Sequence, residues 1–164
     1  MDIRPVRPDE HQALGELTVA AYAAIEPAVV EADDYAGELR DVAGRVTDAD
    51  VLVAVDDAGM VLGGVTYVPG PDSTWAEFRE PDGAGIRMLA VAPEAQGRGV
   101  GEALSRACVA RARAAGRGQI LLHSTDRMTT AHRLYERLGF ARDASLDWEP
   151  LPGFWLRGFR LRLD

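Results

Sequence analysis

The stretch that decides the fold is a strand, a glycine loop and the start of a helix, Leu89-Ala90-Val91-Ala92-Pro93-Glu94-Ala95-Gln96-Gly97-Arg98-Gly99-Val100-Gly101. The glycines at positions 97, 99 and 101 leave the backbone uncovered by side chains. Several N–H groups can therefore converge on one anion at the helix N-terminus, where the helix dipole also favours negative charge. The pattern predicts a binding loop for a pyrophosphate. The alternative interpretation is a flexible turn before a helix.

Two other phosphate-binding motifs are excluded by their spacing. A P-loop ends in Gly-Lys-Ser/Thr, whereas Gly101 is followed by Glu102 and Ala103. A dinucleotide fingerprint needs a glycine at position 102 and a much shorter path from the strand. An unrelated nucleotide-binding α/β domain is therefore disfavoured.

Length and composition point to one globular domain covering residues 1–164. The apolar stretches are far shorter than the roughly 20 residues of a membrane span, and the segment from Met1 to Pro5 lacks the apolar core of a signal peptide. We therefore expect a cytoplasmic protein without membrane contact. The lone Cys108 cannot form an internal disulfide and is expected to be buried on a helix. No histidine spacing indicates a metal site.

The net charge is −8, from 18 Lys and Arg against 26 Asp and Glu. A general nucleic-acid binder needs a basic face to displace counterions, so that class of partner is disfavoured. The acidic balance mildly favours a cationic or neutral small partner over an anionic one.

Periodicity predicts helices between elements of a largely hairpin-connected sheet, which indicates a mixed α/β fold. Strands are expected at 1–6, 51–55, 61–68, 86–91, 119–123, 140–146 and 154–163, with a bulge near Gly158. Helices are expected from Asp9 to a break at Pro27, from a cap at 33–34 with Leu39, Val42 and Val46 on one face, at 99–115 and at 129–138.

The chain resembles the Gcn5-related N-acetyltransferase (GNAT) family. Gln96-Gly97-Arg98-Gly99-Val100-Gly101 matches the acetyl-CoA motif Gln/Arg-x-x-Gly-x-Gly/Ala of that family, and 89–93 and 134–140 match its strand and helix patterns. The resemblance covers roughly residues 86–140. It implies a single-domain fold with a central, mixed, mostly antiparallel sheet of about seven strands, flanked by about four helices, in which the central parallel strands splay apart.

The resemblance also implies acetyl-CoA as co-substrate. The backbone at Leu89, Ala90 and Val91 would hold the pantetheine arm, and Ala131 would line the same path. The loop residues Gln96, Gly97, Arg98, Gly99, Val100 and Gly101 would hold the pyrophosphate. Arg98 either neutralises phosphate charge or is a solvated loop arginine. The family often has Asn where this chain has Met128, so one cofactor hydrogen bond is absent.

Acyl transfer to an amine needs a neutral amine, a stabilised oxyanion and a protonated leaving thiolate. An alkyl ammonium has a pKa of about 10.4, so a base or a desolvating pocket helps it to lose a proton. Tyr135, at the Leu-Tyr position of the family, is the candidate acid; the alternative is a core tyrosine. His123 is the candidate base; the alternative is a partly buried histidine bonded to backbone. Glu77 is a second candidate base; the alternative is a solvated loop carboxylate.

The acceptor pocket is expected from the first helices, the loop before the central strand and the C-terminal strands, as in the family. Aromatic side chains there would line a slot for an apolar amine or simply fill the core. The candidates are Tyr22, Tyr35, Trp75, Phe78, Trp148, Phe154 and Trp155.

The sequence thus predicts an N-acetyltransferase that acts on the primary amine of a small molecule by direct attack in a ternary complex. Two alternatives stay open: a non-catalytic acyl-CoA-binding or sensing module, and a peptide N-terminal acetyltransferase. Neither nucleic acid nor a membrane is an expected partner. Dimerisation through the C-terminal strands is an expectation that comes from the family.

Overall fold

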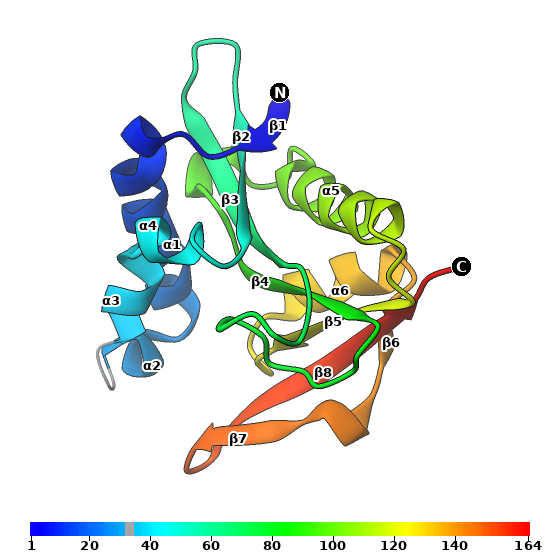
Figure 1. Ribbon diagram of the computed structural model, residues 1–164. Coiled ribbons are helices and arrows are strands. Elements are labelled where there is room, and N and C mark those ends of the chain that lie inside the picture. Colours follow the sequence, from blue (N-terminus) through cyan, green and yellow to red (C-terminus); the bar gives the residue numbers. More distant parts are fainter. Residues whose placement is uncertain (32–34) are drawn as a thin grey trace.

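The fold is a single mixed sheet with helices on both of its faces, as the computed structural model shows (Figure 1). The structure describes residues 1–31 and 35–164. The strands are β1 (Asp2–Pro5), β2 (Asp50–Val55), β3 (Val61–Val68), β4 (Gly83–Val91), β5 (Gln119–Ser124), β6 (Ala141–Arg142), β7 (Trp148–Leu151) and β8 (Phe154–Arg162). The helices of the described residues are α1 (His11–Ile25), α2 (Pro27–Glu31), α3 (Tyr35–Arg40), α4 (Val42–Arg45), α5 (Val100–Ala114) and α6 (Thr129–Arg137).

The predicted parting of the central parallel strands is confirmed. The strand order is β1-β2-β3-β4-β5-β8-β6, with β7 attached to β8, and among the described strands only β4 and β5 run parallel. Their pairing begins at Gly83–Gln119 and stops at Ile86–Leu122, although β4 continues to Val91. Beyond that point β4 is irregular, because Met88 has a φ of 54° and the register with β3 shifts between Gly64 and Thr66. One edge of the second half of β4 therefore lacks a strand partner.

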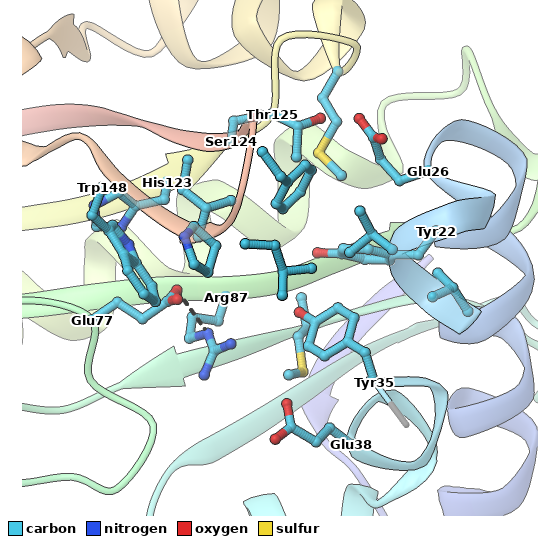
Figure 2. A pocket seen from close by; sticks show the side chains of 18 of the residues that line it. Tyr22, Glu26, Tyr35, Glu38, Glu77, Arg87, His123, Ser124, Thr125 and Trp148 are labelled. Carbon is cyan, nitrogen blue, oxygen red and sulfur yellow. Dashed lines mark ion pairs between the residues drawn. The ribbon is translucent and has the colours of Figure 1, made fainter. Parts of the chain in front are cut away.

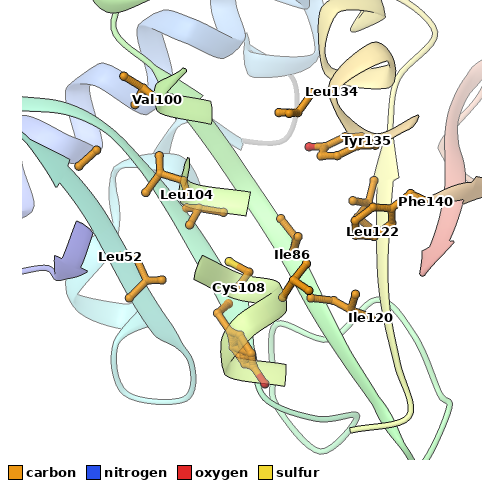
Figure 3. Close-up of a cluster of buried hydrophobic side chains, with 14 of the residues drawn as sticks. Leu52, Ile86, Val100, Leu104, Cys108, Ile120, Leu122, Leu134, Tyr135 and Phe140 are labelled. Carbon is orange, nitrogen blue, oxygen red and sulfur yellow. The ribbon is translucent and has the colours of Figure 1, made fainter. Parts of the chain in front are cut away.

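The two faces of the sheet carry different helices. Figure 1 shows α1 to α4 on one side of the sheet and α5 with α6 on the other. Side chains of β2 alternate between these sides, as a strand requires: Val51 and Val53 pack with Leu14 of α1, whereas Leu52 packs with Leu104 of α5. The buried cluster on the α5 side extends to Ile86, Ile120, Leu122, Leu134, Tyr135 and Phe140 (Figure 3).

The expected second helix is a series of short helices instead. The chain turns at Asp41, whose side chain accepts a hydrogen bond from Gly44 N at 2.9 Å and so caps a new helix, α4. Val46, placed on the buried face by periodicity, is 40% exposed. The predicted cap at residues 33–34 lies outside the described residues.

The C-terminal region also departs from the prediction. Only Ala141–Arg142 of the expected strand 140–146 is extended, and a 3-10 turn at Ala144–Leu146 follows it. The predicted bulge near Gly158 is wrong, because the pairing of β5 with β8 runs unbroken from Gln119–Arg162 to Ser124–Arg157. A glycine is needed there for another reason: an added Cβ would lie 2.2 Å from Cβ of Leu146. Within residues 1–31 and 35–164 there are eight strands and six helices, instead of about seven and about four; the additional elements are β7, α2 and the division of the second helix into α3 and α4.

Cys108 offers a test of the packing around α5. Its side chain is fully buried in the core cluster, and burial raises the pKa of the thiol to about 12. Because the thiolate is the reactive form, we expect no measurable reaction of the folded protein with Ellman's reagent at pH 8, and one thiol per chain in guanidinium chloride. Rapid labelling of the folded protein would contradict this packing.

Candidate active site

The glycine loop forms an exposed turn at the N-terminus of α5. After β4 the chain makes a short 3-10 turn at Pro93–Ala95, and Gly97 and Gly99 then adopt φ values of 76° and 79°. An added Cβ at either glycine would meet nothing within 4 Å. The first helical hydrogen bond is donated by Ala103 N to Gly99 O at 3.0 Å, so the amides before it are not used by the helix. This cradle fits the pyrophosphate of a nucleotide cofactor.

The strand that leads to this loop presents free backbone on one edge. Ala92 N donates to Leu62 O of β3 at 2.8 Å. Because successive residues of a strand point their polar groups to opposite sides, Leu89 and Val91 face away from β3, toward the side where β5 has parted. An extended ligand arm can add to that edge as a further strand would.

Tyr135 lies on α6 beside the same opening. Its ring packs against Phe140 and Phe159 with centroid distances of 5.7 and 6.0 Å, and only 5% of the residue is exposed. Burial raises the pKa of Tyr135 well above the ordinary value of a phenol. Figure 3 shows its hydroxyl pointing from α6 toward β4. Ala131, one turn earlier, is partly buried against the same cluster.

A cavity of about 300 Å³ opens on the other face of the sheet, next to the parted strands. Its walls come from α1 to α3, β4, β5 and the β7–β8 hairpin, so segments far apart in sequence meet there (Figure 2). The lining residues are Tyr22, Glu26, Val29, Val30, Tyr35, Glu38, Glu77, Ile86, Arg87, Met88, His123, Ser124, Thr125, Met128, Trp148, Pro150, Leu151, Phe154 and Leu156.

An ion pair forms one wall of this cavity. Arg87 Nε lies 3.0 Å from Glu77 Oε1, and the guanidinium also donates to Trp75 O at 3.3 Å. Burial works to lower the pKa of Arg87, but Glu77 and the neighbouring tyrosines hold it above its ordinary value. Arg87 therefore stays charged. Glu77 lies in the cavity as predicted, although its carboxylate already has a partner.

His123 lines the cavity beside this ion pair, and a backbone contact orients its ring. Its Nε2 lies 2.8 Å from Leu146 O. A carbonyl oxygen can only accept, so Nε2 carries a proton, and the tautomer that this contact selects has its lone pair on Nδ1. His123 pairs with Gly158 of β8. Because Gly158 has no side chain, Leu146 can approach the backbone there and reach His123.

The predicted aromatic residues divide into two groups. Tyr22, Tyr35, Trp148 and Phe154 line the cavity, and the two tyrosine rings meet edge to face at 6.5 Å. The remaining three are not among the lining residues. Trp75 lies under Arg87 at 5.8 Å, Phe78 packs near Gly83 and Gly85, and Trp155 is 39% exposed beside Arg157.

Sequence reasoning missed several polar residues of this cavity. Arg87 carried a signal, since it interrupts the apolar run 86–91. Glu26, Ser124 and Thr125 had no signal in the sequence. A carboxylate before a proline and two hydroxyls at the end of a strand are ordinary sequence features. The described residues contain no group of three or more His, Cys, Asp or Glu placed to hold a metal ion. Within the same ranges, 1–31 and 35–164, no helix is both long and apolar enough to cross a membrane.

Comparison with solved structures agrees with this fold. An acetyltransferase of the GNAT family from Staphylococcus aureus Mu50 superposes with a TM-score of 0.78 at 13% identity, covering 99% of both chains. A GNAT family acetyltransferase from Brucella melitensis in complex with acetyl-CoA is 26% identical, with a TM-score of 0.66 over 99% of this chain and 88% of that one.

Sequence comparison gives the family. The model of the acetyltransferase (GNAT) domain matches residues 47–142, which is more than half of the chain. The chain belongs to the GNAT acetyltransferase family. A mycothiol acetyltransferase of Saccharopolyspora erythraea is 32% identical over 123 residues, which cover 71% of this chain. The matched segment spans only 40% of that relative.

The close approach of Leu146 to Gly158 can be tested by adding one methyl group. Gly158→Ala should lower the free energy of unfolding by about 1–3 kcal/mol, because the new Cβ must displace Leu146. Urea unfolding measures this change. Gly70→Ala is the control, since its nearest contact is the flexible end of Arg117. Equal stability of the two variants would contradict the packing described at His123.

Proposed function

We propose that this chain transfers an acetyl group from acetyl-CoA to the primary amine of a small molecule. The observation that carries the proposal is the parting of β4 and β5 after Ile86 and Leu122. On the α5 side of this opening lie the unused amides of the glycine loop, and on the other side lies the acidic cavity. The donor and the acceptor would therefore meet at the opening from opposite faces of the sheet.

The donor site is assigned to the residues that the sequence nominated. The amides of Gln96 to Gly101 would hold the pyrophosphate, with Arg98 at its exposed edge. The backbone of Leu89 and Val91 would pair with the pantetheine arm, beside Ala90 and Ala131. Acetyl-CoA supplies a thioester whose carbonyl carbon is open to attack by an amine.

The proton transfers are assigned to two side chains. A bond forms between the acceptor nitrogen and the carbonyl carbon, and the bond from carbon to sulfur breaks. His123 Nδ1 takes a proton from the amine, with Glu77 as the second candidate. Tyr135 gives a proton to the leaving sulfur, and its raised pKa keeps that proton in place near neutral pH. The acceptor arrives as an ammonium and loses two protons per turnover: one is released to solvent, and the other, taken by His123, replaces the proton that Tyr135 gave to sulfur.

The size of the cavity supports a small acceptor. Its volume of about 300 Å³ lies at the lower end of the range for small-molecule sites. The curated relatives are named mycothiol acetyltransferases, a name that also denotes a small acceptor, although the chain spans well under half of their length. A polypeptide acceptor and a sensing module without turnover are the alternatives.

The cofactor cradle is tested by calorimetric titration with acetyl-CoA. Gly99→Glu places a negative side chain where the pyrophosphate is proposed to bind, so we expect at least a tenfold weaker affinity than in the wild type. Gly59→Glu is the matched control, because Gly59 has a φ of 82°, also meets nothing within 4 Å and lies in the β2–β3 hairpin. A wild type that does not bind acetyl-CoA would sink the proposal.

The role of Tyr135 is tested by removing its hydroxyl. Tyr135→Phe should lower kcat by about 10²–10⁴-fold, the usual size of general acid catalysis, with little change in the KM for acetyl-CoA. An amine screen with thiol detection measures both constants. Tyr67→Phe is the control, because Tyr67 is an equally buried tyrosine of the same core cluster but lies on β3 and not on α6. An unchanged kcat would make Tyr135 a core residue with no part in the proton transfers, whereas thiol release with none of the amines would favour a sensing module.

A further inference from the structure

Glu26 is a buried carboxylate that the proposed reaction leaves without a role. It lies between α1 and α2, only 9% of the residue is exposed, and it lines the cavity. Among the described residues, no ion pair or side-chain hydrogen bond holds its carboxylate. Buried polar side chains in folded proteins normally have a partner, so the carboxylate of Glu26 has unused capacity to accept hydrogen bonds from a ligand in the cavity.

Two buried hydroxyls give a second, independent sign of a missing ligand. Ser124 and Thr125 are 3% and 5% exposed, and both line the same cavity. Within the described ranges, neither Oγ of Ser124 nor Oγ1 of Thr125 has a hydrogen-bond partner. Buried polar groups in folded proteins normally have a partner, so these hydroxyls have unused capacity to accept a hydrogen bond.

These groups occupy one end of the cavity, away from the proposed chemistry. In Figure 2, Glu26 and Thr125 point their polar ends toward each other, whereas Glu77, Arg87 and His123 lie at the opposite end. A small molecule can therefore reach both ends at once. The apolar side chains Val29, Val30, Leu151 and Leu156 line the same cavity and suit an alkyl spacer.

The charges of the cavity select the kind of group that binds there. The lining contains three carboxylates, those of Glu26, Glu38 and Glu77, and one guanidinium, that of Arg87. Arg87 is already paired with Glu77. The rings of Tyr22 and Tyr35 stay neutral, because burial raises the pKa of both hydroxyls. Neutral aromatic faces and unpaired carboxylates both attract a cation.

We propose that Glu26, together with Thr125, binds a second ammonium group of the acceptor, and that the acceptor is a small diamine with an alkyl spacer. This inference rests on the proposed function, since one amine of the diamine would be acetylated near His123. The other amine keeps its charge and fixes the molecule in the cavity. The subsite thus selects a dication over an amine with an apolar or anionic tail.

The test is a steady-state comparison of amines with acetyl-CoA and thiol detection. The probes are α,ω-diaminoalkanes of three to six carbons, 1-aminobutane and 4-aminobutanoate. We expect the best diamine to exceed 1-aminobutane in kcat/KM by about 10- to 100-fold, the usual contribution of a charge-assisted hydrogen bond. 4-Aminobutanoate should be the poorest acceptor, because its carboxylate would face Glu26.

Two isosteric variants assign the selectivity to the subsite. Glu26→Gln should lower the ratio of kcat/KM for the diamine to that for 1-aminobutane by about tenfold or more. Glu31→Gln is the matched control, because Glu31 is exposed on α2 and is not a lining residue, and it should keep the wild-type ratio. Circular dichroism and thermal unfolding show whether both variants fold as the wild type does.

Calorimetry of diamine binding to the wild type and to Glu26→Gln gives a readout that does not depend on turnover. The diamine inference is overturned if monoamines or 4-aminobutanoate match the diamines, or if Glu26→Gln leaves the ratio and diamine binding unchanged. Acetylation of any amine in those cases leaves the proposed function standing. Absence of acetyl-CoA binding to the wild type overturns both.

Discussion

The short pairing of β4 with β5 is the constraint on which the rest of the site depends. Four residue pairs hold these parallel strands together, and the ladder ends at Ile86 and Leu122. The left-handed backbone at Met88 and the shifted register with β3 then turn the second half of β4 away from a regular ladder. Backbone groups that a continuous sheet would use become available to a ligand, on the strand that leads through the turn at Pro93–Ala95 to the glycine loop.

The opening between these strands separates two environments of opposite charge. On the α5 side, the helix N-terminus and the uncovered amides of 97–101 attract an anion. On the side of α1 and β7, three carboxylates and neutral aromatic rings favour a cation. The sheet keeps these two fields apart except where β4 and β5 separate. A polyanionic donor and a cationic acceptor can thus approach the same point without competing for one surface.

Elements whose signals are local could be predicted from the sequence. Strand β3, the glycine loop and helices α5 and α6 lie at or within a residue or two of their expected bounds, because turn glycines and apolar periodicity are set by neighbouring residues. The position of Tyr135 beside the opening followed from the family pattern around it. The division of the second helix was missed because Asp41 caps a new helix in the middle of an apolar pattern. Apolar periodicity does not show where a side chain competes with the backbone for hydrogen bonds.

By itself the sequence determined the fold class, the family and the position of the glycine loop, since these depend on a contiguous segment with a fixed order of residues. Only the tertiary structure decided the composition of the cavity. Its polar residues come from the end of α1, from β4 and from the end of β5, and nothing in their spacing along the chain links Glu26 to Thr125. The same holds for His123, which is oriented by Leu146 across Gly158. Contacts between distant segments depend on the register and curvature of the whole sheet, which local propensities do not encode.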